Sequence, residues 1–294
     1  MVESFINYLQ YEKNYSPLTL RRYGESLREF EAYFRMKDDG LRWDNIDADI
    51  IRDWMGQLMD NGEKATTICC KLSALRSFYR FALARHLVEK DPAHRIQSPH
   101  KEKPLPQFVR EEEMNRLLDD IEWSDDFEGV RNRAILMMFY ETGIRRAELI
   151  GLDDGMLDLA QQQLKVTGKR NKQRIIPFGK ELKETLQCYL KVRQQEVKSS
   201  TAAVFQSRKG ERMTQAQVYN VVHEALTLVS SLKKRSPHVL RHTFATAMLN
   251  HEAGLESVQK LLGHASLATT EVYTHTTFEQ LKRVYEKAHP RADV

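Results

Sequence analysis

The stretch from Ser236 to Thr274 decides the fold of this chain, and it reads SPHVLRHTFATAMLNHEAGLESVQKLLGHASLATTEVYT. Ser236 followed by Pro237 is typical of a helix start, because a serine hydroxyl can cap the first turn and proline is favoured at the first helical position. Gly254 and Gly263 interrupt the apolar pattern that follows. The stretch is therefore predicted to form three short helices.

Polar side chains recur at defined places in these three helices. His238 and Arg241 are three residues apart, so they share one face of the first helix. His264 follows the glycine that ends the second helix, and Tyr273 lies near the end of the third. We expect the three helices to bring these four side chains towards a common point.

A zinc site is an alternative interpretation of the first helix. His238 and His242 are four residues apart, which resembles a pair of zinc ligands. The residue after the first histidine is Val239, where a zinc protease needs glutamate, and no third ligand is obvious. The sequence also has no glycine-rich phosphate loop and no carboxylate cluster of the two-metal kind. We therefore expect no cofactor.

Upstream, residues 141–152 read ETGIRRAELIGL. The apolar run from Ala134 to Tyr140 precedes them and predicts a buried helix that ends near Gly143. Arg145 and Glu148 then share a face of the next helix, since they are three residues apart. Glu148 is expected to orient an arginine or to brace its own helix.

Residues 164–177 read LKVTGKRNKQRIIP and predict a β-hairpin with a basic tip, because two β-prone runs flank a Gly-Lys-Arg-Asn-Lys turn. Residues 164–174 contain no acid, and their cations are Lys165, Lys169, Arg170, Lys172 and Arg174. A basic hairpin tip is often only a solvated loop, but so many cations without an acid favour a polyanionic partner.

In this order, the segments TGIRRAELIGL, TGKRNKQRIIPFG, HVLRH and LGHASLATTEVYTH resemble the catalytic boxes of the tyrosine recombinases, most closely the Xer type. The resemblance extends over nearly the whole chain. It implies a set of catalytic residues with Tyr273 as the nucleophile: Arg145, Lys169, His238, Arg241, His264 and Tyr273. Two positions depart from the family pattern. Arg146 stands where an aliphatic residue is usual, and Arg170 stands where glycine is common.

The resemblance implies a site-specific DNA recombinase that cleaves and rejoins strands through a covalent 3′-phosphotyrosine, without metal or ATP. The implied partner is double-stranded DNA with a two-arm recombination site, on which the protein forms a homo- or hetero-tetramer. Whether a second recombinase or a DNA translocase also takes part is left open. Resolution of chromosome or plasmid dimers is expected. The alternatives are an integrase or transposase of a mobile element and a type IB topoisomerase-like strand transferase. A DNA-binding protein without catalysis is disfavoured by the intact residue set.

Residues 1–90 predict four helices, with apolar and aromatic side chains at helical spacing. By pattern this is a small helical bundle, and by resemblance it is the SAM-like, core-binding domain. Several basic and hydroxyl side chains of this bundle could face phosphates, and so could those of the hairpin. The predicted DNA contacts are Arg21, Arg22, Lys64, Thr66, Lys71, Arg76, Arg170, Lys172 and Arg174.

The predicted fold is mainly α with a small antiparallel β-sheet, arranged as a two-domain DNA clamp. A proline-rich linker, residues 91–108, separates the N-terminal domain from a catalytic domain at residues 109–294. The tail carries an amphipathic stripe of Phe278, Leu281, Val284 and Tyr285. We expect this C-terminal helix to dock on a neighbouring subunit, although it could fold back on its own domain.

The overall charge alone does not reveal a DNA-binding protein, since 45 lysines and arginines face 41 aspartates and glutamates, which gives a formal net charge of +4. The local clusters carry that prediction instead. Three cysteines, two of them adjacent, imply no disulfide framework and fit a reducing compartment. No apolar run approaches the length of a membrane span, so the cytoplasm is expected and a membrane partner is not.

Overall fold

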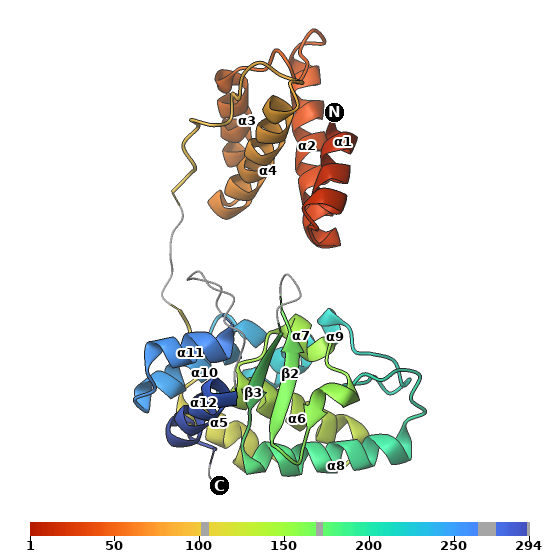
Figure 1. The fold of residues 1–294 in the computed structure, drawn as a ribbon, viewed down its shortest axis with the longest axis vertical. Coiled ribbons are helices and arrows are strands. Elements are labelled where there is room, and N and C mark those ends of the chain that lie inside the picture. The colour runs from red at the N-terminus through yellow and green to blue at the C-terminus, as the bar shows by residue number, and fades with distance from the viewer. Residues whose placement is uncertain (101–105, 169–172, 264–274, 293–294) are drawn as a thin grey trace. The chain divides into compact units, whose positions relative to one another are not determined.

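The computed structural model describes residues 1–100, 106–168, 173–263 and 275–292 (Figure 1). The chain divides into two compact units, Met1–Pro104 and Leu105–Val294. The described residues are mostly helical, with one small antiparallel sheet in the second unit, which confirms the predicted fold class. Within these ranges, no helix is both long enough and apolar enough to cross a bilayer.

The first unit is a bundle of helices around an aromatic core. Its elements are α1 (Val2–Asn7) with η1 (Tyr8–Glu12), α2 (Pro17–Lys37), α3 (Ala48–Asp60) and α4 (Ala65–Ala84). As the sequence predicts, α2 begins after a capping serine, because the Ser16 hydroxyl accepts a hydrogen bond from the Thr19 backbone N–H at 3.3 Å. Phe5, Phe30 and Phe78 are fully buried among further aromatic rings. This core belongs to the first unit alone.

The chain that follows α4 packs back onto this bundle. Ala93 and Ile96 are buried in the same core, and the Arg76 guanidinium donates hydrogen bonds to both of their carbonyls. Residues 91–96, predicted to open the linker, are therefore part of the first unit's packing. In the second unit, the chain is attached to α10 (Pro237–Asn250) at Val109, whose backbone N–H donates a hydrogen bond to the Thr243 hydroxyl at 2.9 Å.

The second unit combines helices with a three-stranded sheet. Its elements are α5 (Glu111–Asn115) with η2 (Arg116–Asp120), α6 (Phe127–Thr142), α7 (Arg146–Ile150), η3 (Asp154–Met156), β1 (Leu157–Asp158), β2 (Gln163–Thr167), β3 (Gln173–Pro177), α8 (Lys180–Glu196), α9 (Gln215–Val229), α10 (Pro237–Asn250), α11 (Leu255–Leu262) and α12 (His275–Ala288). The strands pair antiparallel in the order β1-β2-β3, with Val166 opposite Arg174. The predicted hairpin is thus confirmed as β2 and β3.

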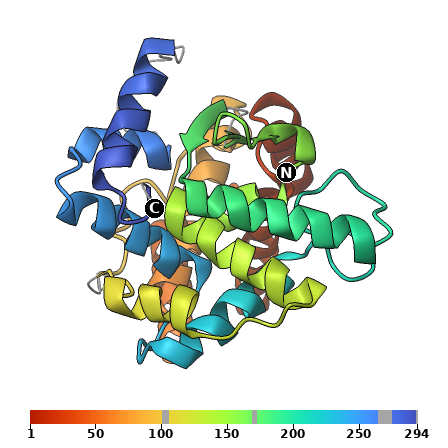
Figure 2. The ribbon, with the colours of Figure 1, turned by 90° about the horizontal axis from the view of Figure 1, so that it is seen from below.

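The buried helix α6 is the centre of this unit. It is surrounded closely enough that every residue from Ala134 to Thr142 is buried, and it packs against α8 and α10. Figure 2 shows α6 and α8 side by side. The helix ends at Thr142, and Gly143 follows in the left-handed conformation with φ 57°. This is the helix end that the sequence predicts.

Of the three helices predicted between residues 236 and 274, the structure confirms the first two as α10 and α11. The third falls outside the described residues. Gly263 ends α11 in the left-handed conformation with φ 64°, which fits the role that the sequence pattern gives it.

The C-terminal helix α12 packs on its own domain. Leu281 and Tyr285 are buried against Phe244 and Leu262, in a small core that α10, α11 and α12 share. In this single chain Leu281 and Tyr285 of the apolar stripe are therefore covered by their own domain, and docking of α12 on a neighbouring subunit stays a prediction. An apolar stripe specifies that a helix must be buried, but it does not specify the surface that buries it.

A buried carboxyl group joins α12 to the end of α6. Glu141 is fully buried, and its Oε2 accepts hydrogen bonds from the Gly179 backbone N–H at 2.9 Å and from the Tyr285 hydroxyl at 3.1 Å. The His289 ring stacks on Tyr285 with centroids 5.1 Å apart. Burial raises the pKa of Glu141 to about 8, although the two hydrogen bonds oppose that change.

We predict that this carboxyl makes the stability of the fold depend on pH. The folded state holds the proton of Glu141 more tightly than the unfolded chain does, because the folded pKa, about 8, exceeds the usual 4.5. The free energy of unfolding should therefore fall as pH rises towards 8 and slightly beyond. Glu141→Gln keeps an oxygen for both donors and should flatten this fall.

Chemical denaturation at pH 7 and pH 9 would measure the effect. This interval avoids the buried His289, because burial lowers the pKa of that ring to about 3. Tyr285→Phe is the matched control, since it removes one hydrogen bond and keeps the carboxyl. Equal pH dependence in the wild type and in Glu141→Gln would contradict the prediction.

Candidate active site

The carbonyl end of α11 is the meeting point of three arginines. The last carbonyls of any α-helix lack partners within the helix, and this end carries partial negative charge. Here three consecutive carbonyls accept hydrogen bonds from arginine side chains: Leu261 from Arg174 Nε (2.9 Å), Leu262 from Arg241 Nη2 (2.6 Å) and Gly263 from Arg145 Nη2 (2.9 Å). Three separate elements thus supply guanidinium groups to one helix end.

Glu148 lies between two of these arginines. Arg174 forms a two-pronged pair with it, with Nη1 to Oε1 at 2.7 Å and Nη2 to Oε2 at 2.9 Å. Arg145 donates to the same carboxylate through Nη1 at 2.8 Å and through its backbone N–H at 2.9 Å. The backbone bond also caps α7, so the carboxylate sets the start of that helix.

The electrostatics of this cluster favour a bound anion. Burial alone raises the pKa of Glu148, but the hydrogen bonds and charges of Arg174 and Arg145 outweigh it and lower the pKa to about 2. Burial, with the charges of Arg145 and Arg174, lowers the pKa of Arg241 to about 9, so this group is still charged at pH 7. Three guanidinium groups against one carboxylate leave two net positive charges.

The turn at Gly143 holds Arg241 in place. The Gly143 carbonyl accepts a hydrogen bond from Arg241 Nη1 at 2.6 Å. A Cβ at this glycine would lie 2.5 Å from Phe244 Cδ1 and 2.9 Å from a methyl group of Leu262. The absence of a side chain at Gly143 therefore allows α6, α10 and α11 to meet at the cluster.

His238 lies in the first turn of α10, on the same helix as Arg241. Partial desolvation and the nearby charges of Arg146 and Lys234 lower the pKa of His238 below its usual 6.5. The ring is therefore mostly neutral at pH 7, and a neutral imidazole can accept a proton.

The structure brings Arg145 into the cluster and directs Arg146 elsewhere. Arg146 Nη2 donates to the side-chain oxygen of Gln215, at the start of α9, at 2.9 Å. Arg145 instead reaches α11 and Glu148. Of these two neighbouring arginines, only Arg145 therefore belongs to the cluster, and its catalytic role stays a prediction.

Lys169, Arg170, Lys172, His264 and Tyr273 lie outside the described residues. Arg174, predicted to contact DNA, is instead buried in the cluster with 6% of its surface exposed. The signal that could have found this is strand alternation, since Arg174 and the buried Ile176 share one face of β3.

The predicted DNA contacts of the first unit fall into two groups. Arg21, Arg22, Lys64 and Thr66 are exposed. Lys71 has 11% of its side chain exposed and pairs with Glu29 and Glu63, each at 2.6 Å. Arg76 donates to carbonyls of the segment after α4. The last two side chains are thus already engaged within the bundle.

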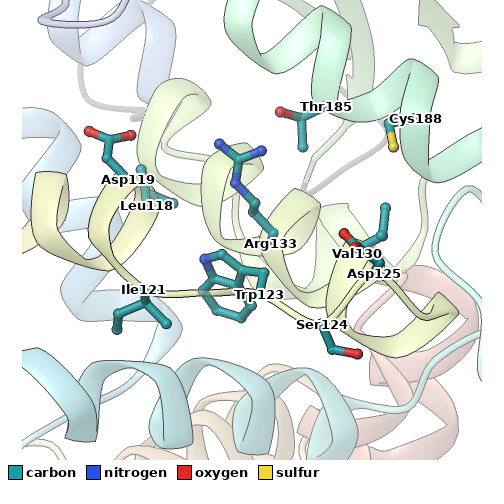
Figure 3. Close-up of a pocket in the computed structure, with 10 residues that line it drawn as sticks. All are labelled: Leu118, Asp119, Ile121, Trp123, Ser124, Asp125, Val130, Arg133, Thr185 and Cys188. Atoms are coloured by element: carbon teal, nitrogen blue, oxygen red, sulfur yellow. The ribbon is translucent and has the colours of Figure 1, made fainter.

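A pocket between η2, α6 and α8 is a separate feature of the second unit (Figure 3). Trp123, Arg133 and Cys188 are among its lining residues. Arg133 approaches Glu181 of α8 at 3.7 Å, and Trp123 donates to the Leu117 carbonyl at 3.1 Å. No lining residue belongs to the arginine cluster, so the pocket and the cluster are separate sites.

Comparison with known proteins identifies the family of this chain. Residues 107–280 match the phage integrase family, and residues 2–86 match the SAM-like N-terminal domain of phage integrases. This chain belongs to the phage integrase family of tyrosine recombinases. The matches confirm the resemblance that the four sequence boxes indicate, and they confirm the SAM-like prediction for the N-terminal bundle.

Curated relatives place the recombinase with the Xer type. The tyrosine recombinase XerC of Bacillus pumilus is 39% identical over 99% of this chain and 97% of its own length. That of Chlorobaculum tepidum is 37% identical over 98% of this chain and 94% of its own length. The recombinase is thus a site-specific tyrosine recombinase of the Xer type.

Solved structures share the fold of the recombinase. The XerH site-specific recombinase, in a post-cleavage complex with a palindromic difH substrate, matches with a TM-score of 0.71 and 24% identity, over 97% of this chain and 84% of that one. A lambda integrase dimer bound to a core site matches with a TM-score of 0.67 and 18% identity, over 95% of this chain and 93% of that one.

The close packing at Gly143 leads to a stability prediction. Gly143→Ala should lower the free energy of unfolding by about 1–2 kcal/mol through the left-handed backbone, and by about 1–3 kcal/mol more through overpacking against Phe244 and Leu262. Gly62→Ala is the matched control, because Gly62 is also left-handed, with φ 78°, but an added Cβ would meet nothing within 4 Å. Denaturation of both variants measures the difference, and equal losses would contradict the packing argument.

Proposed function

We propose that the arginine cluster binds the scissile phosphate of double-stranded DNA and that Tyr273 attacks this phosphate to form a 3′-phosphotyrosine. The observation that supports this most strongly is the net positive charge held by Arg145, Arg174, Arg241 and Glu148. In the pentacoordinate transition state, negative charge grows on the non-bridging oxygens. Fixed guanidinium groups stabilise that charge more than they stabilise the ground state.

Two of the arginines can donate to the phosphate. A guanidinium has five N–H donors, and within the described ranges the side chains of Arg145 and Arg241 each use two of them. Arg145 has 32% of its side chain exposed. In this proposal Arg145 and Arg241 clamp the non-bridging oxygens, with His264 as a further donor.

Proton transfer completes the proposed roles. A tyrosine hydroxyl has a pKa of about 10 in water, so Tyr273 needs a base at neutral pH. His238 is the proposed base, because its lowered pKa keeps it neutral. The leaving 5′ oxygen needs a proton, and Lys169 is the proposed acid. The phosphotyrosine conserves the energy of the broken bond, so rejoining requires no ATP.

We further propose a two-arm DNA site filled by a tetramer, either of this chain or of this chain with a second recombinase. Related XerH and lambda integrase structures hold DNA, which supports duplex DNA as the partner. The SAM-like unit supplies the second half of a clamp through Arg21, Arg22, Lys64 and Thr66. Exchange of α12 between neighbours would transfer its contacts with Glu141 to the next subunit.

Resolution of chromosome or plasmid dimers is the proposed biological role. The XerC relatives support it, since they are 36–39% identical over nearly the full chain. Integration of a mobile element is the second candidate, and the Tn1549 transposon integrase shares the fold at 18% identity. We also propose a cytoplasmic location, which the proposed DNA substrate supports, and an activating DNA translocase as a further partner.

The nucleophile can be tested with a nicked suicide substrate, which traps the covalent protein–DNA adduct. Tyr273→Phe should bind DNA and trap no adduct. Tyr285→Phe is the matched control and should still trap it, because the Tyr285 hydroxyl is buried and donates to Glu141. An adduct formed by Tyr273→Phe would refute the assignment.

A further inference from the structure

We propose that Arg174 is a positioning residue for the recombination reaction, which holds Arg145 in place through Glu148 and through the end of α11. The inference rests on the proposed function of Arg145 at the scissile phosphate. It replaces the sequence-based prediction that Arg174 contacts DNA, because the observed surroundings of Arg174 are protein groups.

Burial and hydrogen bonding separate Arg174 from solvent. Its side chain is 6% exposed, while that of Arg145 is 32% exposed. All three nitrogens of the Arg174 guanidinium donate within the domain, two to Glu148 and one to the Leu261 carbonyl. The phosphate would have to displace a buried ion pair to reach Arg174. Arg145 is accessible, and Arg241, although 8% exposed, donates to two backbone carbonyls and forms no ion pair with the described residues.

The first connection between Arg174 and Arg145 is the carboxylate of Glu148. Both guanidinium groups donate to Glu148 Oε1, at 2.7 Å from Arg174 and 2.8 Å from Arg145. Arg174 also donates to Oε2, which fixes the plane of the carboxylate. Without this two-pronged pair, the carboxylate that orients Arg145 could rotate.

The second connection is the left-handed turn at Gly263, whose carbonyl accepts from Arg145. A Cβ at Gly263 would lie 3.1 Å from Arg174 Cδ and 3.2 Å from its Nε, so this glycine sits against the Arg174 side chain. Arg174 also binds the carbonyl of Leu261 in the last turn of α11. Of the two acceptors that hold the Arg145 side chain, Glu148 is therefore bonded directly by Arg174, and the Gly263 carbonyl belongs to a turn that lies against the Arg174 side chain.

This arrangement couples two parts of the proposed chemistry. Arg174 is the second residue of β3, and β3 begins directly after Lys172. The strand that follows the proposed acid Lys169 therefore also carries the group that positions Arg145. A displacement of β3 would therefore shift Arg145 in the arginine cluster through these side-chain contacts.

The test is a double-mutant cycle on single-turnover adduct formation, with DNA saturated by protein. Arg174→Met removes the guanidinium and retains much of the side-chain volume. Misplacement of Arg145 by about 1 Å should slow cleavage by about a hundredfold. Arg145→Ala alone should slow it by about a hundred- to a thousandfold. Because Arg174 acts through Arg145, the double variant should be no slower than Arg145→Ala.

Arg193→Met is the matched control. Arg193 also bonds closely within the same unit, to Asp154 at 2.8 Å and to the carbonyls of Ala203 and Val204 at 2.8 Å, and none of these groups belongs to the arginine cluster. The Arg193→Met variant should be less stable than the wild type, but it should not show the large loss of cleavage rate that we expect for Arg174→Met. DNA affinity, measured by gel shift, should change less than twofold in Arg174→Met, because the side chain does not touch DNA.

Each other outcome identifies what fails. Three results would overturn the role of Arg174. The first is a double variant whose rate loss equals the product of the two single losses. The others are a cleavage rate of Arg174→Met no lower than that of Arg193→Met, and a large loss of DNA affinity in Arg174→Met. Normal cleavage by Arg145→Ala would refute the proposed function itself. If Arg174→Met does not fold, Arg174→Lys keeps the charge without the two-pronged pair, and the same cycle with that variant decides the question.

Discussion

The arrangement of the second unit depends on the carbonyl end of α11, which must be hydrogen-bonded. A helix of eight residues exposes its last carbonyls, and three of them are satisfied by arginines from the turn after α6, from β3 and from α10. Each arginine brings its own element to this point, so the helix end aligns segments that lie far apart in the sequence. The left-handed turns at Gly143 and Gly263 allow these segments to approach closely.

The same constraint explains how several positive charges can be held together. The carbonyls and the Glu148 carboxylate offset much of the repulsion among the guanidinium groups, but they leave net positive charge for an anion. Burial of these groups removes water that would otherwise screen them. The proposed phosphate site is thus organised before DNA binds, and fixed dipoles and charges are most effective when they need no rearrangement during the reaction.

Local sequence signals predicted much of the fold. Ser236 with Pro237, the glycines at 143 and 263, and the β-prone runs of the hairpin each determine structure over a few residues, so the start of α10, the ends of α6 and α11 and the hairpin follow from them. The start of α6 at Phe127 does not, because the apolar run that predicts this helix begins only at Ala134. The shared helix face of Arg145 and Glu148 is local in the same way, and it anticipated their contact.

What the sequence left open depends on contacts between distant segments. The basic composition of the hairpin suggested that Arg174 faces DNA, whereas the buried face of β3 takes it to Glu148 and Leu261. The stripe on α12 predicted burial but not the surface that covers it. Glu141 directly follows an apolar run, and its partners Gly179 and Tyr285 are many residues away, so no local pattern indicates that a carboxyl joins them.

The most direct measurement is NMR of the arginine side chains in the DNA-free, full-length protein, with the signals assigned by single Arg→Lys substitutions. The account predicts separate, slowly exchanging Nη–H signals for Arg145, Arg174 and Arg241, because carbonyls and Glu148 restrain each guanidinium. The exposed Arg22 should give averaged signals. Averaged signals for Arg145 and Arg241 as well would contradict the claim that the anion site is organised before DNA binds.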